Sequence, residues 1–338
     1  MALTINTNVS SLVAQRNLNN ATNKLNISIE RMTTGFKINH ASDNAAGYSI
    51  SDMWVTQLGS LDVAADNAAT GSDLLTTAEE TYSLLTGHLQ RVRDLTEQAA
   101  NGTYGSQSLK AIQSEIHARL LEVNRISANS EFNGIKLMSY DLDNAANNKE
   151  VGITARGIDL QVGLYANEYS RINLKVELFA NASTSGLFKN MSKTSESGKQ
   201  LEELLDAAGG DINALGDDKN LQAFAAACSG LVYDQAKGLS LQTGADFGAK
   251  EMLAFIDSAI NEISDRVTNI GAAQNRVQSA VSALDVQSQN LTSSLSTLRD
   301  TDVASESSNY IQAQILQQAS ATLLATANQA PSIALNLI

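Results

Sequence analysis

A heptad repeat in the C-terminal third of the chain constrains the fold more than any other feature. Residues 250–298 carry apolar side chains at intervals of seven, with more apolar residues at most interleaved positions. This pattern predicts a coiled-coil helix, which at ~1.5 Å per residue would be roughly 75 Å long. A seam of that length needs partner helices of similar length. The seven residues of the seam are Ile256, Ile263, Ile270, Val277, Leu284, Leu291 and Leu298.

The N-terminal half supplies the partner helices. Apolar residues with helical spacing cover residues 61–92, and Asn101-Gly102 with Gly105 ends this stretch as a helix terminus and a loop. A second helical stripe covers residues 109–126, and Asn133-Gly134 marks a turn after it. Two antiparallel helices and the long C-terminal helix predict a rod-like bundle.

The middle of the chain changes from helical to alternating periodicity. Apolar residues alternate over 158–164 and again over 172–178, which predicts two strands of a hairpin around residues 166–171. Residues 181–247 are rich in Gly, Ser, Asp and Lys, and we expect a small, exposed insert there. Two short helices are expected in the insert, one with Leu201, Leu204 and Leu205, the other with Leu221, Phe224, Ala225 and Cys228. The predicted fold is therefore mainly α: a long antiparallel helical rod or coiled coil with a β-hairpin and a small α-rich central insert.

Both ends of the chain are poor in charge. No charged side chain occurs in the first fifteen residues or after Glu306. Helices with amides on several faces suit a buried helix–helix environment, and we expect these ends to order only when neighbouring chains surround them. The apolar residues expected to mediate this packing are Ile311, Ile315, Leu316, Leu323 and Leu324 at the C-terminal end. An N-terminal helical stripe contains Leu18, Ala21, Leu25, Ile29, Met32 and Phe36.

The composition argues against several functional classes. One Cys among 338 residues cannot form an internal disulfide, and a single Pro agrees with long helices. The net charge of −13 opposes nucleic-acid binding. His40, His88 and His117 lack metal-ligand spacing with each other or with Cys228, and no Gly-rich loop joins a strand to a helix. We therefore expect no catalytic residue, no metal, no cofactor and no enzymatic activity.

The N-terminus and the overall hydropathy argue against membrane insertion and a cleaved leader. No stretch of about 18 apolar residues could span a membrane. The first residues have no basic region followed by an apolar run. The expectation is a cytoplasmic chain, or one exported by a route that does not use a cleaved signal peptide.

Six sequence blocks resemble bacterial flagellin. In the N-terminal half these are INTNVSSLVAQRNLNNATNKLNISIERMTTGFKINHASDNAAGYSIS (5–51), LQRVRDLTEQAANGTYG (89–105) and SEFNGIKLM (130–138). In the C-terminal part they are NIGAAQNRVQSAV (269–281), LRDTDVASESS (298–308) and QAQILQQASATLLATANQAP (312–331). The resemblance covers roughly 1–180 and 250–338 and leaves out the insert. The chain departs from the family's usual residues at Trp54, Cys228 and Ile338.

The resemblance implies the organisation and function of a flagellar filament subunit. Residues 1–44 would form an N-terminal D0 helix and connector, 45–180 the N-terminal D1 helices and hairpin, and 181–247 a variable outer insert. Residues 248–300 would form the long D1 helix and 301–338 the C-terminal D0 helix. Subunits of this family leave the cell unfolded through the flagellar type III apparatus and polymerise into a helical propeller for swimming. The implied partners are other copies of the chain, an export chaperone, the filament cap and the hook–filament junction proteins.

The resemblance also implies candidate contact residues. Arg91, Leu95 and Glu115 match family positions that lie at subunit contacts and that are bound by the flagellin-sensing Toll-like receptor of a host. A Ser/Thr-rich stretch of the insert is a candidate for O-glycosylation, as in some flagellins, and an unmodified polar loop is the alternative. Its candidate residues are Ser183, Thr184, Ser185, Ser192, Thr194 and Ser195.

Two alternatives to a filament subunit remain open from the sequence. A hook–filament junction protein shares the terminal pattern, although the 312–329 block is more typical of flagellin. An enzymatic insert is the alternative of a different class, and about seventy residues with no His and one Cys offer it few catalytic groups.

Overall fold

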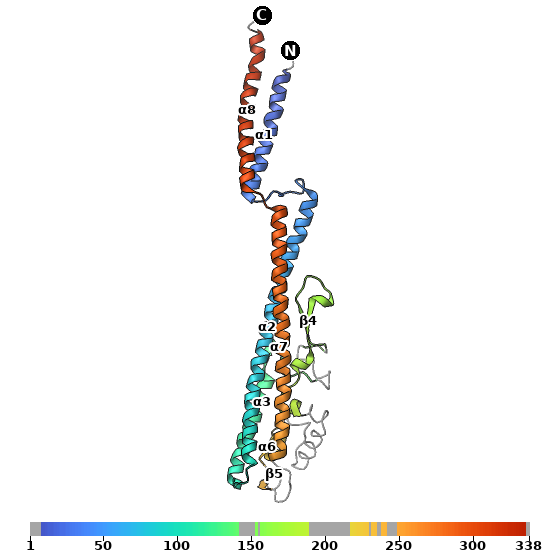
Figure 1. The fold of residues 1–338 in the computed structure, drawn as a ribbon, viewed down its shortest axis with the longest axis vertical. Coiled ribbons are helices and arrows are strands. Elements are labelled where there is room, and N and C mark those ends of the chain that lie inside the picture. Colours follow the sequence, from blue (N-terminus) through green and yellow to red (C-terminus); the bar gives the residue numbers. More distant parts are fainter. Residues whose placement is uncertain are drawn as a thin grey trace. The chain divides into compact units, whose positions relative to one another are not determined.

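The computed structural model describes residues 8–141, 153–154, 156–188, 217–229, 231–234, 238–241 and 249–335. They divide into two compact units, Met1–Asp62 with Asp285–Ile338, and Val63–Leu284. The α-helices are α1 (Val9–Thr34), α2 (Ala45–Ala99), α3 (Ser106–Asn129), α6 (Asp218–Cys228), α7 (Ala249–Arg299) and α8 (Val303–Leu335) (Figure 1). Two-stranded antiparallel sheets pair β1 (Glu131–Phe132) with β2 (Ile135–Lys136), β3 (Ile158–Gln161) with β4 (Arg171–Leu174), and β5 (Leu231–Asp234) with β6 (Gly238–Leu241).

The core of the second unit lies along α2, α3 and α7. The heptad seam predicted for α7 is confirmed there, because a period of seven keeps its residues on one helix face. The seam residues from Ile256 to Leu284 are buried, whereas Leu291 and Leu298, in the first unit, are half-buried. Polar pairs fix α7 antiparallel to α2: Gln274 donates to Glu79 at 2.8 Å, and Arg93 pairs with Asp257 at 2.5 Å.

The predicted β-hairpin is present but shorter than expected. Strands β3 and β4 pair from Ile158 opposite Leu174 to Gln161 opposite Arg171. Residues 176–178, predicted as the end of the second strand, lie instead in a 3-10 helix (Val176–Phe179). The turn predicted at Asn133-Gly134 joins β1 to β2, and both residues have positive φ, 49° and 79°. Asn and Gly tolerate this left-handed conformation, which suits a two-residue hairpin loop.

The insert is more buried and less exclusively helical than the sequence predicted. Helix α6 confirms the second expected helix, and the ring of its fully buried Phe224 lies 4.5 Å from that of Phe188. Both rings belong to the same core as α2 and α3. The polar composition of the insert concealed these apolar anchors, and the hairpin β5–β6 was not predicted. The helix expected around Leu201, Leu204 and Leu205 lies outside the described residues.

A buried arginine that the sequence analysis missed holds the chain where the insert begins. Arg266 of α7 is 5% exposed and donates to the carbonyl oxygen of Ala180 at 2.9 Å. It also forms an ion pair with Glu262 one turn earlier. The hydroxyl of Tyr82, buried in the same cluster, donates to the Leu178 carbonyl at 2.9 Å. A charge desolvated in this way is stable only while every partner stays in place, so this cluster fixes the path of the chain at residues 178–181.

Candidate functional site

The terminal helices α1 and α8 pack side by side through a seam of small and polar residues (Figure 1). On α1 the buried positions recur every seven residues at Ala14, Ala21 and Ser28. On α8 they recur at the same interval at Glu306, Ala313 and Ser320. Small side chains let two helices approach closely, as they do in helix pairs that lack a large apolar seam.

Polar contacts fix the antiparallel register of this pair. Where α1 ends and α8 begins, Arg31 and Glu306 form an ion pair with 3.8 Å between nitrogen and oxygen. Gln317 donates to the Thr22 hydroxyl at 3.2 Å near the middle. Near the start of α1, Ser11 donates to the Asn328 side-chain oxygen and Asn8 donates to the Ala327 carbonyl, both at 2.7 Å.

Bulky apolar side chains of the terminal helices therefore remain on the outside. Among the predicted contact residues, Ile315 is 60% and Leu323 62% exposed, and Leu324 is half-buried. The other exposed apolar residues of these helices are Val9, Leu12, Val13, Ile27, Ile29, Met32, Val303, Ile311 and Leu316. Exposed apolar side chains in this number are typical of an interaction site.

Two expectations about the ends need correction. The ends pack against each other within one chain, so they do not depend on neighbouring chains for a first partner. The N-terminal stripe was right only in part, since Ala21 belongs to the seam and Leu18 and Leu25 are half-buried, whereas Ile29 and Met32 are exposed. The stripe was chosen by side-chain hydrophobicity, whereas the closest helix approach selects small side chains.

The connectors that follow α1 and precede α8 are joined by backbone hydrogen bonds. Gly35 ends α1 in a left-handed conformation with φ 77°, which glycine adopts without steric cost. Its carbonyl accepts from the Thr301 amide at 2.9 Å, and the Lys37 amide donates to the Arg299 carbonyl at 2.7 Å. The guanidinium of Arg299 lies 4.2 Å from the ring centroid of Phe36, a favourable cation–π geometry.

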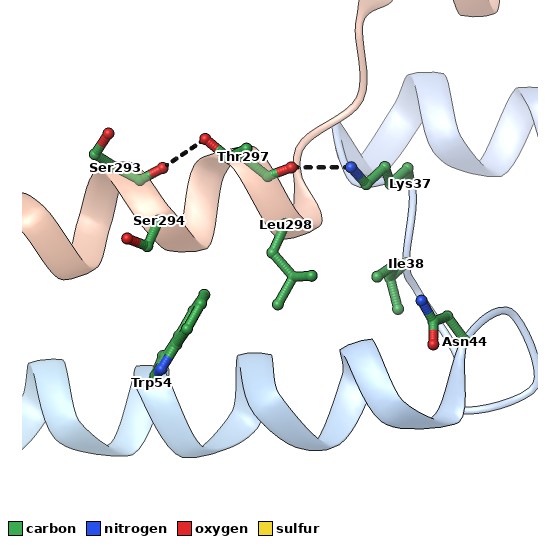
Figure 2. Close-up of a pocket in the computed structure, with 8 residues that line it drawn as sticks. All are labelled: Lys37, Ile38, Asn44, Trp54, Ser293, Ser294, Thr297 and Leu298. Carbon is green, nitrogen blue, oxygen red and sulfur yellow. Dashed lines mark hydrogen bonds between the residues drawn. The ribbon is translucent and has the colours of Figure 1, made fainter.

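A cavity of 520 Å³ lies beside these connectors (Figure 2). Trp54 extends from α2 toward α7, and Leu298 extends from α7 toward α2. The buried Ile38 adds to the apolar lining, while Lys37 donates to the Thr297 carbonyl at 2.9 Å. Ser293, Ser294 and Asn44 are the uncharged polar residues of the lining, together with Thr297.

An ion pair on the surface of α2 and α3 joins two of the three residues predicted to contact neighbouring subunits. Arg91 and Glu115 form an exposed ion pair with two contacts, 3.0 Å from Nε and 2.9 Å from Nη2. Leu95, the third residue, is 2% exposed and belongs to the core. The structure brings Arg91 and Glu115 together and removes Leu95 from the surface.

Comparison with known proteins decides the family. Residues 5–141 match the bacterial flagellin N-terminal helical region, and residues 253–338 match the bacterial flagellin C-terminal helical region. Polar flagellin F of Vibrio parahaemolyticus is 34% identical over 380 aligned residues, and Flagellin B of Vibrio anguillarum is 35% identical over 375. Flagellin B of Vibrio cholerae is 34% identical over 375, and each alignment covers all of both chains. The chain belongs to the bacterial flagellin family.

This flagellin is thus a structural subunit of the flagellar filament, an extracellular assembly of identical copies. Within the described part of the chain, no helix is long and apolar enough to cross a membrane. No group of three His, Cys, Asp or Glu side chains suited to a metal ion occurs among the same residues. His40 pairs with Glu30 at 2.7 Å, and His117 lies 2.9 Å from Asp218.

The glycosylation candidates fall into three groups. Thr184 of the flagellin is fully buried, and both its amide and its hydroxyl donate to the side-chain oxygen of Asn124 at 2.9 Å. A glycan cannot be attached there in the folded chain, so this candidate is wrong. Ser183 and Ser185 are half-buried and hydrogen-bonded to each other at 2.9 Å. Ser192, Thr194 and Ser195 lie outside the described residues.

The single cysteine lies at the end of α6 and is fully buried. Burial raises the pKa of the Cys228 thiol to about 12, although a hydrogen bond with Thr96 acts in the opposite direction. A thiol with this pKa is protonated at neutral pH and therefore a poor nucleophile.

Proposed function

We propose that this flagellin polymerises through the apolar side chains that α1 and α8 leave on their outer surface. The observation that carries the proposal is the separation of side chains on these helices. Small and polar residues form the intrachain seam, and bulky apolar residues such as Ile315 and Leu323 stay exposed. Burying one such side chain contributes about 1.5–3 kcal/mol, and other copies of the same surface can supply the cover. Copies related by a rotation that does not close form an open helical polymer.

The proposal gives the terminal charges a specific place. Glu306 is 6% exposed and Arg31 is its ion-pair partner, so this pair lies inside the intrachain seam. The exposed face of α8 beyond Glu306 carries no charge at all. An uncharged surface can be buried between copies without the desolvation cost of an unpaired ion.

A second contact with neighbouring subunits is proposed at the Arg91–Glu115 pair on the outer face of α2 and α3. Paired, exposed charges determine the orientation of the partners and their association rate more than the affinity of the contact. The same two residues would also supply binding to the host Toll-like receptor, without Leu95, whose side chain is buried.

The remaining assignments follow from family membership. We propose the division into residues 1–44, 45–180, 181–247, 248–300 and 301–338 as D0 and D1 segments around an outer insert. The export chaperone, the filament cap and the hook–filament junction proteins are the proposed partners, and export proceeds without a cleaved signal peptide. The role is structural, with no catalysis.

Seeded polymerisation of purified variants tests the role of the terminal surface. The variant Ile315→Gln/Leu323→Gln should keep the helix content of the monomer, because Gln is a good helix former, yet fail to extend seeds into filaments. The control Ile315→Leu/Leu323→Met keeps the apolar surface and should polymerise like the unchanged chain. Circular dichroism measures the helix content of the monomer, and electron microscopy shows whether filaments form. Normal filaments from the glutamine variant would refute the proposal.

A further inference from the structure

The turn of the β3–β4 hairpin presents two exposed tyrosines. Tyr169 is 96% and Tyr165 61% exposed. The turn is internally braced: the Gln161 side-chain amide donates to the carbonyls of Gly163 at 2.7 Å and Tyr165 at 3.0 Å. Asn167 accepts from the Ser170 amide at 2.9 Å and caps the 3-10 helix (Glu168–Ser170). An aromatic ring held out into solvent on an ordered turn is a candidate anchor for a partner.

The cavity beside Trp54 has a lining that suits a tyrosine side chain. It is a recess open to solvent, and its volume of 520 Å³ is large enough to admit an aromatic ring. Trp54, Ile38 and Leu298 provide an apolar lining for an aromatic ring. Ser294 and the Asn44 amide provide polar partners for a phenolic hydroxyl (Figure 2). A tyrosine uses both kinds of surface, because its ring is apolar and its hydroxyl seeks a hydrogen bond.

We propose that Tyr169 of one copy docks into the Trp54 cavity of another copy in the filament. This inference rests on the proposed polymerisation. An open helical polymer is built from heterologous contacts, in which a projection on one copy meets a recess at a different place on the next. The exposed tyrosine and the cavity are such a projection and recess on one chain.

Charge complementarity supports the second copy as the occupant. Glu168 precedes Tyr169 and is exposed, so it approaches the cavity together with the ring. Lys37 is the cation of the cavity lining and is exposed as well. Opposite charges at the rim of a contact steer its orientation, and the remainder of the binding energy comes from the buried ring.

Cysteine cross-linking between chains tests the contact directly. In a Cys228→Ala background, chains with Tyr169→Cys are mixed with chains that carry Ser294→Cys, polymerised on seeds and oxidised. Neither chain contains two cysteines, so a disulfide between the two variants can form only between copies. We expect the mixed dimer in filaments, and at most a fifth of that yield before assembly. Ser282→Cys, an exposed serine on the same helix, replaces Ser294→Cys as the control and should give at most the same background.

Assembly thermodynamics provides the second readout. Tyr169→Ala and Trp54→Ala should each raise the critical concentration for polymerisation about tenfold. The double variant should do no worse than the stronger single variant, because both substitutions remove one contact. Independent effects would instead multiply to about a hundredfold and would refute the pairing. Cross-linking at the background level in well-formed filaments would also refute it. Failure of the unchanged chain to form filaments would refute the proposed polymerisation itself.

Discussion

Gly71 of α2 packs directly against the side chain of Leu160 in β3, and a Cβ atom at position 71 would collide with that side chain. The neighbouring Asn67 donates to the Gln161 carbonyl at 3.3 Å, one turn earlier on the same helix face. The hairpin therefore packs against α2 in two ways. Leu160 occupies the space that a side chain at position 71 would fill, and Asn67 forms a hydrogen bond with the backbone of β3. A glycine inside a helix usually weakens it, so a close approach of this kind explains its presence.

Replacing this glycine should push the hairpin away from α2. We expect Gly71→Ala to lower the free energy of unfolding by about 1–3 kcal/mol through overpacking. The control Gly87→Ala lies on the same helix where nothing approaches within 4 Å, and it should raise stability by roughly 0.5–1 kcal/mol. Adding Leu160→Val to Gly71→Ala should recover part of the loss. Urea unfolding measures the three variants and the unchanged chain, and equal effects at the two glycines would contradict the packing of the hairpin against Gly71.

The second prediction concerns the buried arginine. Burial opposes the charge of Arg266, yet the neighbouring Tyr82 and Glu262 leave its pKa above the ordinary value. Arg266→Gln should therefore cost about 3–5 kcal/mol of unfolding free energy, because it leaves Glu262 without its partner in a largely buried cluster. Arg125→Gln removes an exposed ion pair with Glu122 and should cost less than about 1 kcal/mol. A small effect at Arg266 in urea unfolding would show that the cluster does not hold the start of the insert.

The long helices were predictable because their apolar periodicity extends over many turns. The span expected for α7, 250–298, differs from the observed Ala249–Arg299 by one residue at each end. The seam of the terminal helices was predictable only in part: Ala21 was in the predicted stripe, whereas Ala14 and Ser28 carry almost no hydrophobic signal. Only the partner helix defines them, through a register that no single sequence segment specifies.

The candidate sites also differ in how far the local sequence predicts them. The exposure of Ile315 and Leu323 follows from an uncharged helix with too many apolar residues for one partner. The burial of Leu95 and Thr184 depends on parts of the chain that are distant in sequence; Thr184, for example, packs against α3 and donates to Asn124 of that helix. Nothing in the local sequence around these residues indicates such a cover.

The third prediction uses the raised pKa of Cys228. A thiol with an ordinary pKa of 9.0 that rises to about 12 on folding stabilises the folded state fully below pH 9. That stabilisation is lost as pH rises from 9 toward 12, because the unfolded chain then binds fewer protons than the folded chain. The free energy of unfolding should fall more steeply over this window in the unchanged chain than in Cys228→Ala. Parallel curves in urea titrations from pH 8 to 11 would contradict the prediction.

The same thiol gives an independent measurement of burial at neutral pH. A thiol-specific chromogenic reagent at pH 8 should label the folded chain at least a hundredfold more slowly than the chain in denaturing urea. Rapid labelling without urea would mean that α6 does not stay packed on its neighbours.

The last prediction separates an intrachain from an interchain role of the Arg91–Glu115 pair. Arg91→Glu places two negative charges together, yet the pair is exposed, so the monomer should lose less than about 1 kcal/mol. The swap Arg91→Glu/Glu115→Arg restores the pair within the chain and should restore monomer stability fully. If the proposed contact with a neighbouring subunit is right, the swapped chain still presents each charge at the wrong place, and its seeded elongation should stay at least fivefold slower than that of the unchanged chain. Full recovery of elongation in the swapped chain would assign the pair to the fold of the single subunit alone.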